Sequence, residues 1–248
     1  MPVQATIADR IATISFGGTK GNSLPGELLR ELATTIESTG QRSDVNVILL
    51  RSEGDGPFCA GASFDELKSI GDEATGKRFF LGFAGVILAM TRCPKPVVVR
   101  VQGKAVGGGV GVVAAADYAV ATRSAGIRLS ELAIGIGPFV VGPVIEHKIG
   151  RGPYAAMAID AEWRDASWAE RHGLYATVKD SVAELDAALG LFVRKLADAN
   201  PDAVSRIKRI VWAGTEHWEK LLDERAAMSG SLVLSDFTKR AIAAFEKR

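Results

Sequence analysis

The stretches Phe58-Cys59-Ala60-Gly61-Ala62 and Gly107-Gly108-Gly109 say most about the fold of this chain. The first follows an apolar run typical of a strand, and the second opens a segment typical of a helix. Glycine and alanine leave the backbone N–H groups unshielded, and the first N–H groups of a helix have no partner within that helix. Two such donors that converge on one carbonyl oxygen would form an oxyanion hole, which stabilises an enolate or a tetrahedral oxyanion. Taken singly, each stretch is also compatible with a tight turn.

The composition describes a folded chain without a bias toward a macromolecular partner. Its 248 residues are 47% hydrophobic and 24% charged, with a formal net charge of +1. This length suffices for one large core, or for a core domain with a small appendage. The balanced charge gives no footprint for nucleic acid or for an anionic membrane, although a few local cations could hold an anionic small molecule.

Cysteine usage and the first residues of the chain bear on the cellular compartment. Cys59 and Cys93 fit neither a disulfide framework nor the spacing of metal ligands, so we expect the reducing environment of the cytoplasm. No signal peptide is recognised, and no window reaches the ~18 apolar residues that span a bilayer. No histidine lies near Cys59 in the sequence to activate it as a nucleophile. We therefore expect Cys59 to serve as a small buried hydrophobic residue.

Apolar periodicity predicts alternating strands and helices over about three quarters of the chain. The predicted strands cover residues 11–16, 45–51, 97–102 and 118–122, and the predicted helices cover residues 25–38 and 108–116. From Val182 onward only helical periods occur, with breaks at Asn200-Pro201 and near Gly230-Ser231. The sequence therefore predicts an α/β core over residues 1–190 and a helical region over residues 191–248.

The helical segment from about Val182 onward carries more apolar residues at helical spacing than a solvated appendage would expose. They are Leu185, Leu189, Phe192, Val193, Leu196, Trp212, Trp218, Leu221 and Leu222. We expect this surface to be buried on the core or between subunits.

Several familiar catalytic signatures are absent from the chain. It has no phosphate-binding P-loop and no Gly-x-Ser-x-Gly elbow. Its three histidines, His147, His172 and His217, are too scattered to predict a metal site. The segment Gly107–Gly111 lacks the Gly-x-Gly-x-x-Gly spacing of dinucleotide-binding loops.

Several motifs together resemble the crotonase superfamily, the enoyl-CoA hydratase/isomerase family, over essentially the whole chain. In chain order they are Asn22-Ser23-Leu24, Phe58–Ala62, Lys95-Pro96-Val97, Gly103–Gly109, Asp117, Glu131–Gly135 with Pro138, and the terminal Ala244–Arg248. Their order and gaps argue against a chance match. The resemblance implies a spiral of ββα units with a C-terminal helical trimerisation region, assembled as a homotrimer or a dimer of trimers.

The resemblance also implies an acyl-CoA thioester as substrate and no cofactor, because coenzyme A is part of the substrate. The N–H groups of Ala60 and Gly108 would bind the thioester oxygen, and Glu131 would transfer the proton. The other residues that it assigns to substrate and CoA binding are Lys20, Asn22, Leu24, Gly61, Ala62, Gly107, Phe245 and Lys247. Lys20 and Lys247 are equally compatible with solvated surface charges, and Glu131 with a capping carboxylate.

The chain departs from the family's hydratases at one of their two glutamates, which is Gly111 here. One carboxylate can still take and return a proton, and members with a single glutamate shift a double bond in this way. Phe139 stands where some relatives place an aspartate, and Phe139–Val141 replaces a glycine-rich turn, so we expect an apolar acyl pocket. The residues considered for a second polar group are Asp65, Glu66, Lys77, Arg78, Glu146 and His147.

Two classes of function remain open. The first is an enzyme that hydrates or isomerises an enoyl-CoA, with decarboxylation or thioester hydrolysis as variants on the same oxyanion hole. The second is a non-catalytic acyl-CoA-binding homologue. The presence of Glu131 favours the enzyme.

Overall fold

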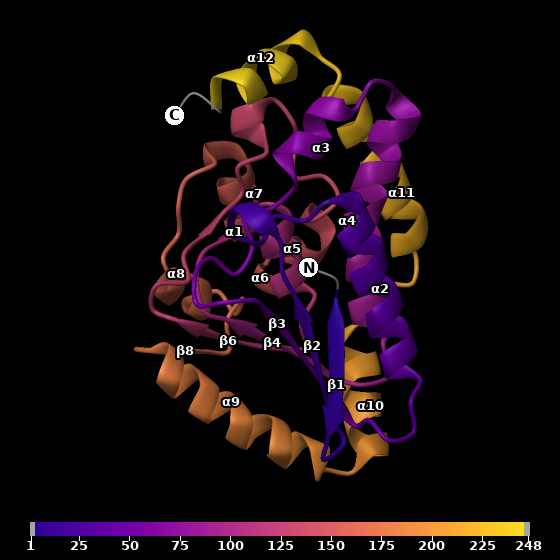
Figure 1. The fold of residues 1–248 in the computed structure, drawn as a ribbon, viewed down its shortest axis with the longest axis vertical. Coiled ribbons are helices and arrows are strands. Elements are labelled where there is room, and N and C mark those ends of the chain that lie inside the picture. Colours follow the sequence, from indigo (N-terminus) through magenta and orange to yellow (C-terminus); the bar gives the residue numbers. More distant parts are fainter. Residues whose placement is uncertain (1–2, 246–248) are drawn as a thin grey trace.

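A six-stranded sheet forms the centre of the structure, a computed structural model that describes residues 3–245 (Figure 1). Its order is β1 (Gln4–Ala8), β2 (Ile11–Phe16), β3 (Val47–Ser52), β4 (Val97–Val101), β6 (Tyr118–Thr122) and β8 (Thr177–Lys179). The first two strands are antiparallel, and all other neighbouring pairs are parallel. A second, parallel sheet pairs β5 (Ala105–Val106) with β7 (Ile127–Arg128).

The strands in the middle of the large sheet are covered on both faces. All five residues of β4 are buried, and four of the five are valines, as is typical of a strand covered on both faces. On one face lies α9 (Val182–Ala197), whose Leu185, Leu189 and Val193 join a cluster with strand residues of β3, β4 and β6 (Figure 1). The other face packs against α2 (Gly26–Gly40), which in turn contacts α4 (Glu73–Arg92).

The C-terminal helices return to the body of the molecule. Of these, α11 (Trp218–Leu232) packs along α4, while α12 (Asp236–Phe245) lies against α3 (Phe64–Ser69) and the short helix η1 (Leu132–Ile134). The remaining helices are α1 (Thr19–Asn22), α5 (Gly108–Ala114), α6 (Gly142–Ile149), α7 (Arg151–Asp160), α8 (Ala166–Arg171) and α10 (Pro201–Val211). No helix within residues 3–245 is long and apolar enough to cross a bilayer.

Most predicted elements are confirmed, with small shifts at their ends. Strands are present at 11–16, 97–101 and 118–122, and the helix predicted over 25–38 covers Gly26–Gly40. The predicted break at Asn200-Pro201 is confirmed, because the Asn200 side chain accepts hydrogen bonds from the first N–H groups of α10. The break between α10 and α11, where Gly214 has a φ of +86°, was not predicted. The boundary placed at residue 190 falls inside α9.

The apolar residues of the C-terminal region are largely buried within their own chain. Leu185, Leu189 and Leu222 are at most 2% exposed, and Trp212 and Trp218 at most 5%. Their burial is therefore not evidence for contacts between subunits.

Candidate active site

A narrow cavity brings the two glycine-rich stretches together with the segment around Glu131. Its walls come from the loop after β3, the start of α5, the segment between β7 and α6, and helices α3, α4 and α11. The lining residues are Ala60, Gly61, Ala62, Phe64, Leu67, Phe80, Phe83, Gly107, Gly108, Ser130, Glu131, Ile134, Ile136, Gly137, Pro138, Phe139, Val140, Val141 and Ser229.

Backbone hydrogen bonds on both sides fix the loop over residues 58–62. Val106 donates to the carbonyl oxygen of Cys59 at 2.9 Å, and Leu24 donates to that of Gly61 at 2.8 Å. Gly61 has a φ of +92°, and a Cβ there would lie 2.9 Å from the carbonyl oxygen of Val106. Only glycine fits this close approach of the loop to β5.

The structure corrects the prediction that the Ala60 N–H is free to bind a ligand. This N–H donates to the carbonyl oxygen of Gly21 at 3.0 Å, so it is already satisfied and does not serve the cavity. The N–H of Ala62 has no acceptor in the part of the chain that the structure describes. Ala62, two residues further on, is therefore the donor that this loop offers to a ligand.

The second donor lies at the start of α5. Gly107 adopts φ +53° and ψ −117°, and its N–H donates to the backbone carbonyl oxygen of Arg128 at 2.8 Å. Among the described residues the N–H of Gly108 has no acceptor. A Cβ at residue 108 would overlap the ring of Phe83, so a side chain here would enter the packed wall. The position that a Cβ at Gly61 would take lies 3.9 Å from the nitrogen of Gly108, which places the two stretches side by side.

Glu131 lies between β7 and η1 and is the ionisable residue among those that line the cavity. Its Oε1 lies 2.9 Å from where a Cβ of Gly107 would stand, so the carboxylate is next to the α5 amides. Its Oε2 is buried and has no hydrogen-bond partner among residues 3–245. Burial raises the pKa of Glu131 to about 7. A carboxyl group in this state can both take and give a proton near neutral pH.

The position expected for a second glutamate is filled by another side chain. A Cβ on Gly111 would lie 2.5 Å from Cγ1 of Val141 and 2.8 Å from its Cβ. Val141 belongs to the Phe139–Val141 segment, all of which lines the cavity. The part of the cavity wall that this segment forms is apolar, as expected, and its role in binding an acyl group stays a prediction.

The six residues considered for a second polar group do not line the cavity. Each of five has a partner elsewhere: Asp65 with Lys20, Glu66 with the N–H of Gly26, Lys77 with Asp223, Glu146 with Arg151, and His147 with the carbonyl oxygen of Val211. Arg78 is exposed on α4.

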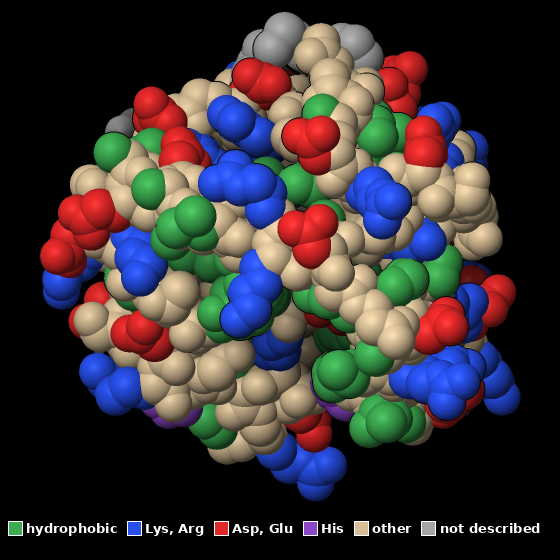
Figure 2. Space-filling view, turned by 90° about the horizontal axis from the view of Figure 1, so that it is seen from below, with side chains coloured by type: hydrophobic (Ala, Val, Ile, Leu, Met, Phe, Trp, Pro, Cys, Tyr) green, Lys and Arg blue, Asp and Glu red, His purple; other side chains and the backbone are tan. Residues whose placement is uncertain are grey.

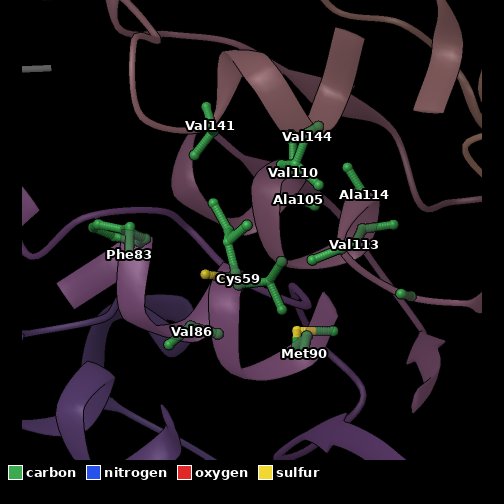
Figure 3. Close-up of a cluster of buried hydrophobic side chains, with 14 of the residues drawn as sticks. Cys59, Phe83, Val86, Met90, Ala105, Val110, Val113, Ala114, Val141 and Val144 are labelled. Atoms are coloured by element: carbon green, nitrogen blue, oxygen red, sulfur yellow. The ribbon is translucent and has the colours of Figure 1, made fainter. Parts of the chain in front are cut away.

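Cys59 is part of the core beneath the cavity. It is fully buried, and Figure 3 shows it surrounded by apolar side chains of α4 and α5, among them Phe83, Val86, Met90 and Val110. Burial raises the pKa of the Cys59 thiol to about 12. The thiolate form that a nucleophile needs is therefore disfavoured. This agrees with the interpretation of Cys59 as a small buried hydrophobic residue.

The residues predicted to bind coenzyme A differ in what they can offer a ligand. The Asn22 amide is satisfied internally: its Nδ2 donates to the carbonyl oxygens of Glu53 and Pro57, and its Oδ1 accepts from Gly18. Leu24 is fully buried, its backbone N–H donates to the carbonyl oxygen of Gly61, and its carbonyl oxygen accepts from Ser63.

Lys20 is exposed, and its ammonium group lies 2.6 Å from a carboxylate oxygen of Asp65 at a separate surface cleft. The backbone of Phe245 ends α12. Lys247 lies outside the described residues.

Sequence reasoning missed Ser130 and Ser229 as lining residues. Ser130 directly precedes Glu131 and could have been included with it. Ser229 lies on α11, and no local motif marks it.

Comparison with known proteins identifies the family and the fold. The model of the enoyl-CoA hydratase/isomerase family matches residues 6–248. The enoyl-CoA hydratase structure from Bacillus halodurans superimposes with a TM-score of 0.90 at 20% identity, covering 98% of this chain and 100% of that one, which shows a shared crotonase fold.

Two curated relatives have different activities. A peroxisomal Delta(3,5)-Delta(2,4)-dienoyl-CoA isomerase of Arabidopsis thaliana is 26% identical over 239 residues, or 90% of this chain and 84% of the relative. A (7aS)-7a-methyl-1,5-dioxo-2,3,5,6,7,7a-hexahydro-1H-indene-carboxyl-CoA hydrolase of Rhodococcus jostii (strain RHA1) is 32% identical over 160 residues, or 63% of this chain and 62% of the relative. The family match over nearly all of the sequence settles the wider assignment: the chain belongs to the enoyl-CoA hydratase/isomerase family.

Proposed function

We propose that this protein isomerises the double bond of an enoyl-CoA thioester by moving one proton with Glu131. The observation that carries the proposal is the pairing of Gly111 with Val141. Because the Val141 side chain fills the place of a second carboxylate, Glu131 is left as the acid/base group among the described lining residues. Hydration in this family uses two carboxylates to hold the attacking water, whereas a shift of the double bond needs one.

The two unpaired N–H groups supply the electrostatic part of the reaction. The thioester oxygen accepts hydrogen bonds from Ala62 and Gly108, which stabilise the negative charge that develops on it. The Glu131 carboxylate removes a proton from C2 of a 3-enoyl thioester, and the electrons of that C–H bond move into a dienolate. The Glu131 carboxyl then gives the same proton to C4, and the double bond ends between C2 and C3. Neither an oxidant nor a water molecule is consumed.

The protonation equilibrium of Glu131 suits this cycle. A general base and the acid derived from it work best when the pKa is near the working pH, and burial brings Glu131 to about 7. The apolar walls also keep water away from the dienolate. The similarity to a dienoyl-CoA isomerase supports isomerisation. The similarity to a hydrolase makes hydrolysis the competing reaction on the same scaffold.

Coenzyme A would lie along the 58–62 loop, which runs from the cavity toward the surface cleft that contains Lys20. Lys20 would then attract the phosphates after releasing Asp65, with Phe245 and Lys247 reaching the nucleotide as the resemblance implies. Asn22 and Leu24 would act by holding the loop.

The test is the variant Glu131→Gln, which keeps the shape of the side chain and removes its proton transfer. With a 3-enoyl-CoA we expect kcat to fall on the order of 10² to 10⁴, and the affinity for a saturated acyl-CoA to stay within a few fold. Formation of the conjugated 2-enoyl thioester is followed optically. The matched control is Glu146→Gln, whose carboxylate pairs with Arg151 at 2.9 Å outside the cavity.

Three results would contradict the proposal. Unchanged turnover in Glu131→Gln would remove this residue from the mechanism. Faster hydration of a 2-enoyl-CoA than isomerisation by the wild-type protein would favour a hydratase. Binding of acyl-CoA without turnover of either substrate would favour a non-catalytic homologue.

A further inference from the structure

One wall of the cavity includes a serine that the proposed reaction does not use. Ser229 comes from α11 and lines the same cavity as Glu131, although the two lie far apart in the chain. The residue is 1% exposed. Its neighbours in the lining on this side are apolar, including Leu67, Phe80 and Phe83.

The Ser229 hydroxyl is unsatisfied within the protein. Serine inside a helix commonly donates to a carbonyl oxygen of the preceding turn, as Ser231 does to Met228 at 3.1 Å on the same helix. Ser229 makes no such bond, or any other side-chain hydrogen bond, with the residues that the structure describes. A hydroxyl at a cavity wall that makes no bond within the protein is free to donate to or accept from a group that enters the cavity.

The charge of the cavity limits what that group can be. The residues that line it include no Lys, Arg or His, and Glu131 is their only carboxylate. An acyl group with a second carboxylate would meet an apolar wall and a like charge without a compensating cation. A neutral oxygen atom, as in a ketone or an alcohol, would meet a hydroxyl that can donate or accept.

We infer that Ser229 is a specificity residue that hydrogen-bonds to a neutral oxygen function on the acyl part of the thioester. The substrate class is thus oxygenated acyl-CoA rather than plain hydrocarbon or dicarboxylic acyl-CoA. The inference rests on the proposed function only in that an acyl-CoA occupies this cavity.

The experiment measures the binding of saturated thioesters, which do not react by the proposed mechanism. The probes are two matched pairs: pentanoyl-CoA with 4-oxopentanoyl-CoA, and hexanoyl-CoA with 5-oxohexanoyl-CoA. The proteins are the wild type, Ser229→Ala, Ser130→Ala and Ser231→Ala. Ser231 is an exposed hydroxyl on the same helix, and Ser130 is the other serine of the cavity.

We expect the wild type to bind at least one oxo thioester roughly 3- to 10-fold more tightly than its hydrocarbon partner, as one neutral hydrogen bond allows. Ser229→Ala is expected to bring that ratio to about 1 while leaving hydrocarbon binding unchanged, whereas Ser130→Ala and Ser231→Ala keep the ratio. Alanine is a strong helix former, and Ser229→Cys supplies a second variant of similar size if Ser229→Ala melts early.

The inference is overturned if the wild type prefers neither oxo thioester, if Ser229→Ala keeps the preference, or if only Ser130→Ala loses it. Wild-type isomerase turnover in Glu131→Gln, with a preference that depends on Ser229, would overturn the proposed function and support the inference. Failure of the wild type to bind any of the four thioesters would overturn both.

Discussion

Gly111 and Val141 form a complementary pair within the site. The valine Cγ1 lies 2.5 Å from the place of a Cβ on residue 111, so either position can carry a side chain only if the other is small. The loss of one carboxylate is therefore accompanied by an apolar side chain that occupies its space. From this packing we expect that restoring the glutamate alone will not restore a hydratase site.

We predict that Gly111→Glu with Val141→Gly gains hydration of a 2-enoyl-CoA, whereas Gly111→Glu alone does not. In the single variant the new side chain overlaps Val141, and overpacking of this kind costs about 1–3 kcal/mol of stability. The double variant provides room for a second carboxylate beside the substrate. The measurement is hydratase activity at matched folded concentration, with Val141→Gly as control. Equal hydration by the two Gly111→Glu variants would show that Val141 is not the obstacle.

The pKa of Glu131 predicts a pH dependence for the proposed isomerase. The reaction starts from the carboxylate, and burial raises the pKa of this group to about 7. We therefore expect kcat/KM to increase as the pH rises toward 7 and to level off above it. A profile that is already flat from pH 5 to 8 would contradict a buried Glu131 as the base.

Stability provides an independent check on the same pKa. The folded state binds the proton more tightly than the unfolded chain does, so stability is lost as the pH rises from about 4.3 through about 7. The glutamine side chain of Glu131→Gln does not titrate in this pH range, so that variant lacks this contribution to the pH dependence of stability. Relative to that variant the wild type should lose up to about 3 kcal/mol of unfolding free energy between pH 5 and pH 8, measured by urea denaturation.

At the scale of single residues, the sequence identified what a local motif defines. The glycine run places an amide at residue 108, and the Glu-x-x-x-Gly stretch places Glu131. The choice between Ala60 and Ala62 depends on the carbonyl oxygen of Gly21, which reaches Ala60 through a distant loop. Ser229 enters the site through the packing of α11, and no spacing in the sequence reports that contact.

The packing of α11 on α4 depends on two glycines. A Cβ on Gly76 would lie 2.8 Å from the carbonyl oxygen of Gly230, and a Cβ on Gly230 would lie 2.5 Å from the nitrogen of Lys77. The helix backbones are thus in direct contact at this crossing. Because Ser229 precedes Gly230, the crossing also determines how one wall of the cavity is placed.

We predict that Gly230→Ala destabilises the protein by roughly 1–3 kcal/mol despite the better helix propensity of alanine. The added methyl group meets backbone atoms of α4, which cannot move without separating the helices. The matched control is Gly190→Ala on α9, where a Cβ would meet only the end of the Arg194 side chain at 3.6 Å. That variant should gain about 0.5–1 kcal/mol. Equal effects of the two substitutions in chemical denaturation would contradict the close crossing.

The elements show the same division between local and distant causes. The start of α10 was predictable because Asn200 and Pro201 provide a cap and a first helical residue. The end of α10 was not, because Trp212 continues the apolar pattern while Gly214 turns the chain. Trp212 is anchored by Asp117, which accepts a hydrogen bond from its indole at 2.7 Å. Such an anchor is visible only after the chain has folded.

The outer surface of α9 and α10 remains apolar in the single chain. Leu191, Ile207 and Ile210 are each more than 60% exposed, and Val211 is 48% exposed. An apolar groove runs between the two helices, lined by Phe192, Leu196, Val204, Ile207 and Val211 among others. Figure 2, the view from below, shows hydrophobic side chains in patches between charged groups of both signs. Large apolar side chains gathered at an exposed face indicate a protein–protein contact.

We predict that the protein is a trimer or a dimer of trimers in solution and that this face contributes to the contact. The assignment of the face differs from the sequence analysis, because Leu185, Leu189 and Trp218 are buried in their own chain. The double variant Ile207→Asp with Ile210→Asp places two charges where apolar side chains would be desolvated, so it should shift the assembly toward monomers at micromolar concentration.

Light scattering and sedimentation measure the outcome. The control is Ile159→Asp on α7, which is 73% exposed and lies on the opposite side of the sheet from α9 (Figure 1). Because the substituted side chains are exposed in the single chain, the monomer should keep its fold, and its circular dichroism spectrum tests this directly. A wild-type protein that is monomeric at micromolar concentration would rule out the assembly. A double variant that stays trimeric would show that the contact between subunits lies on another face.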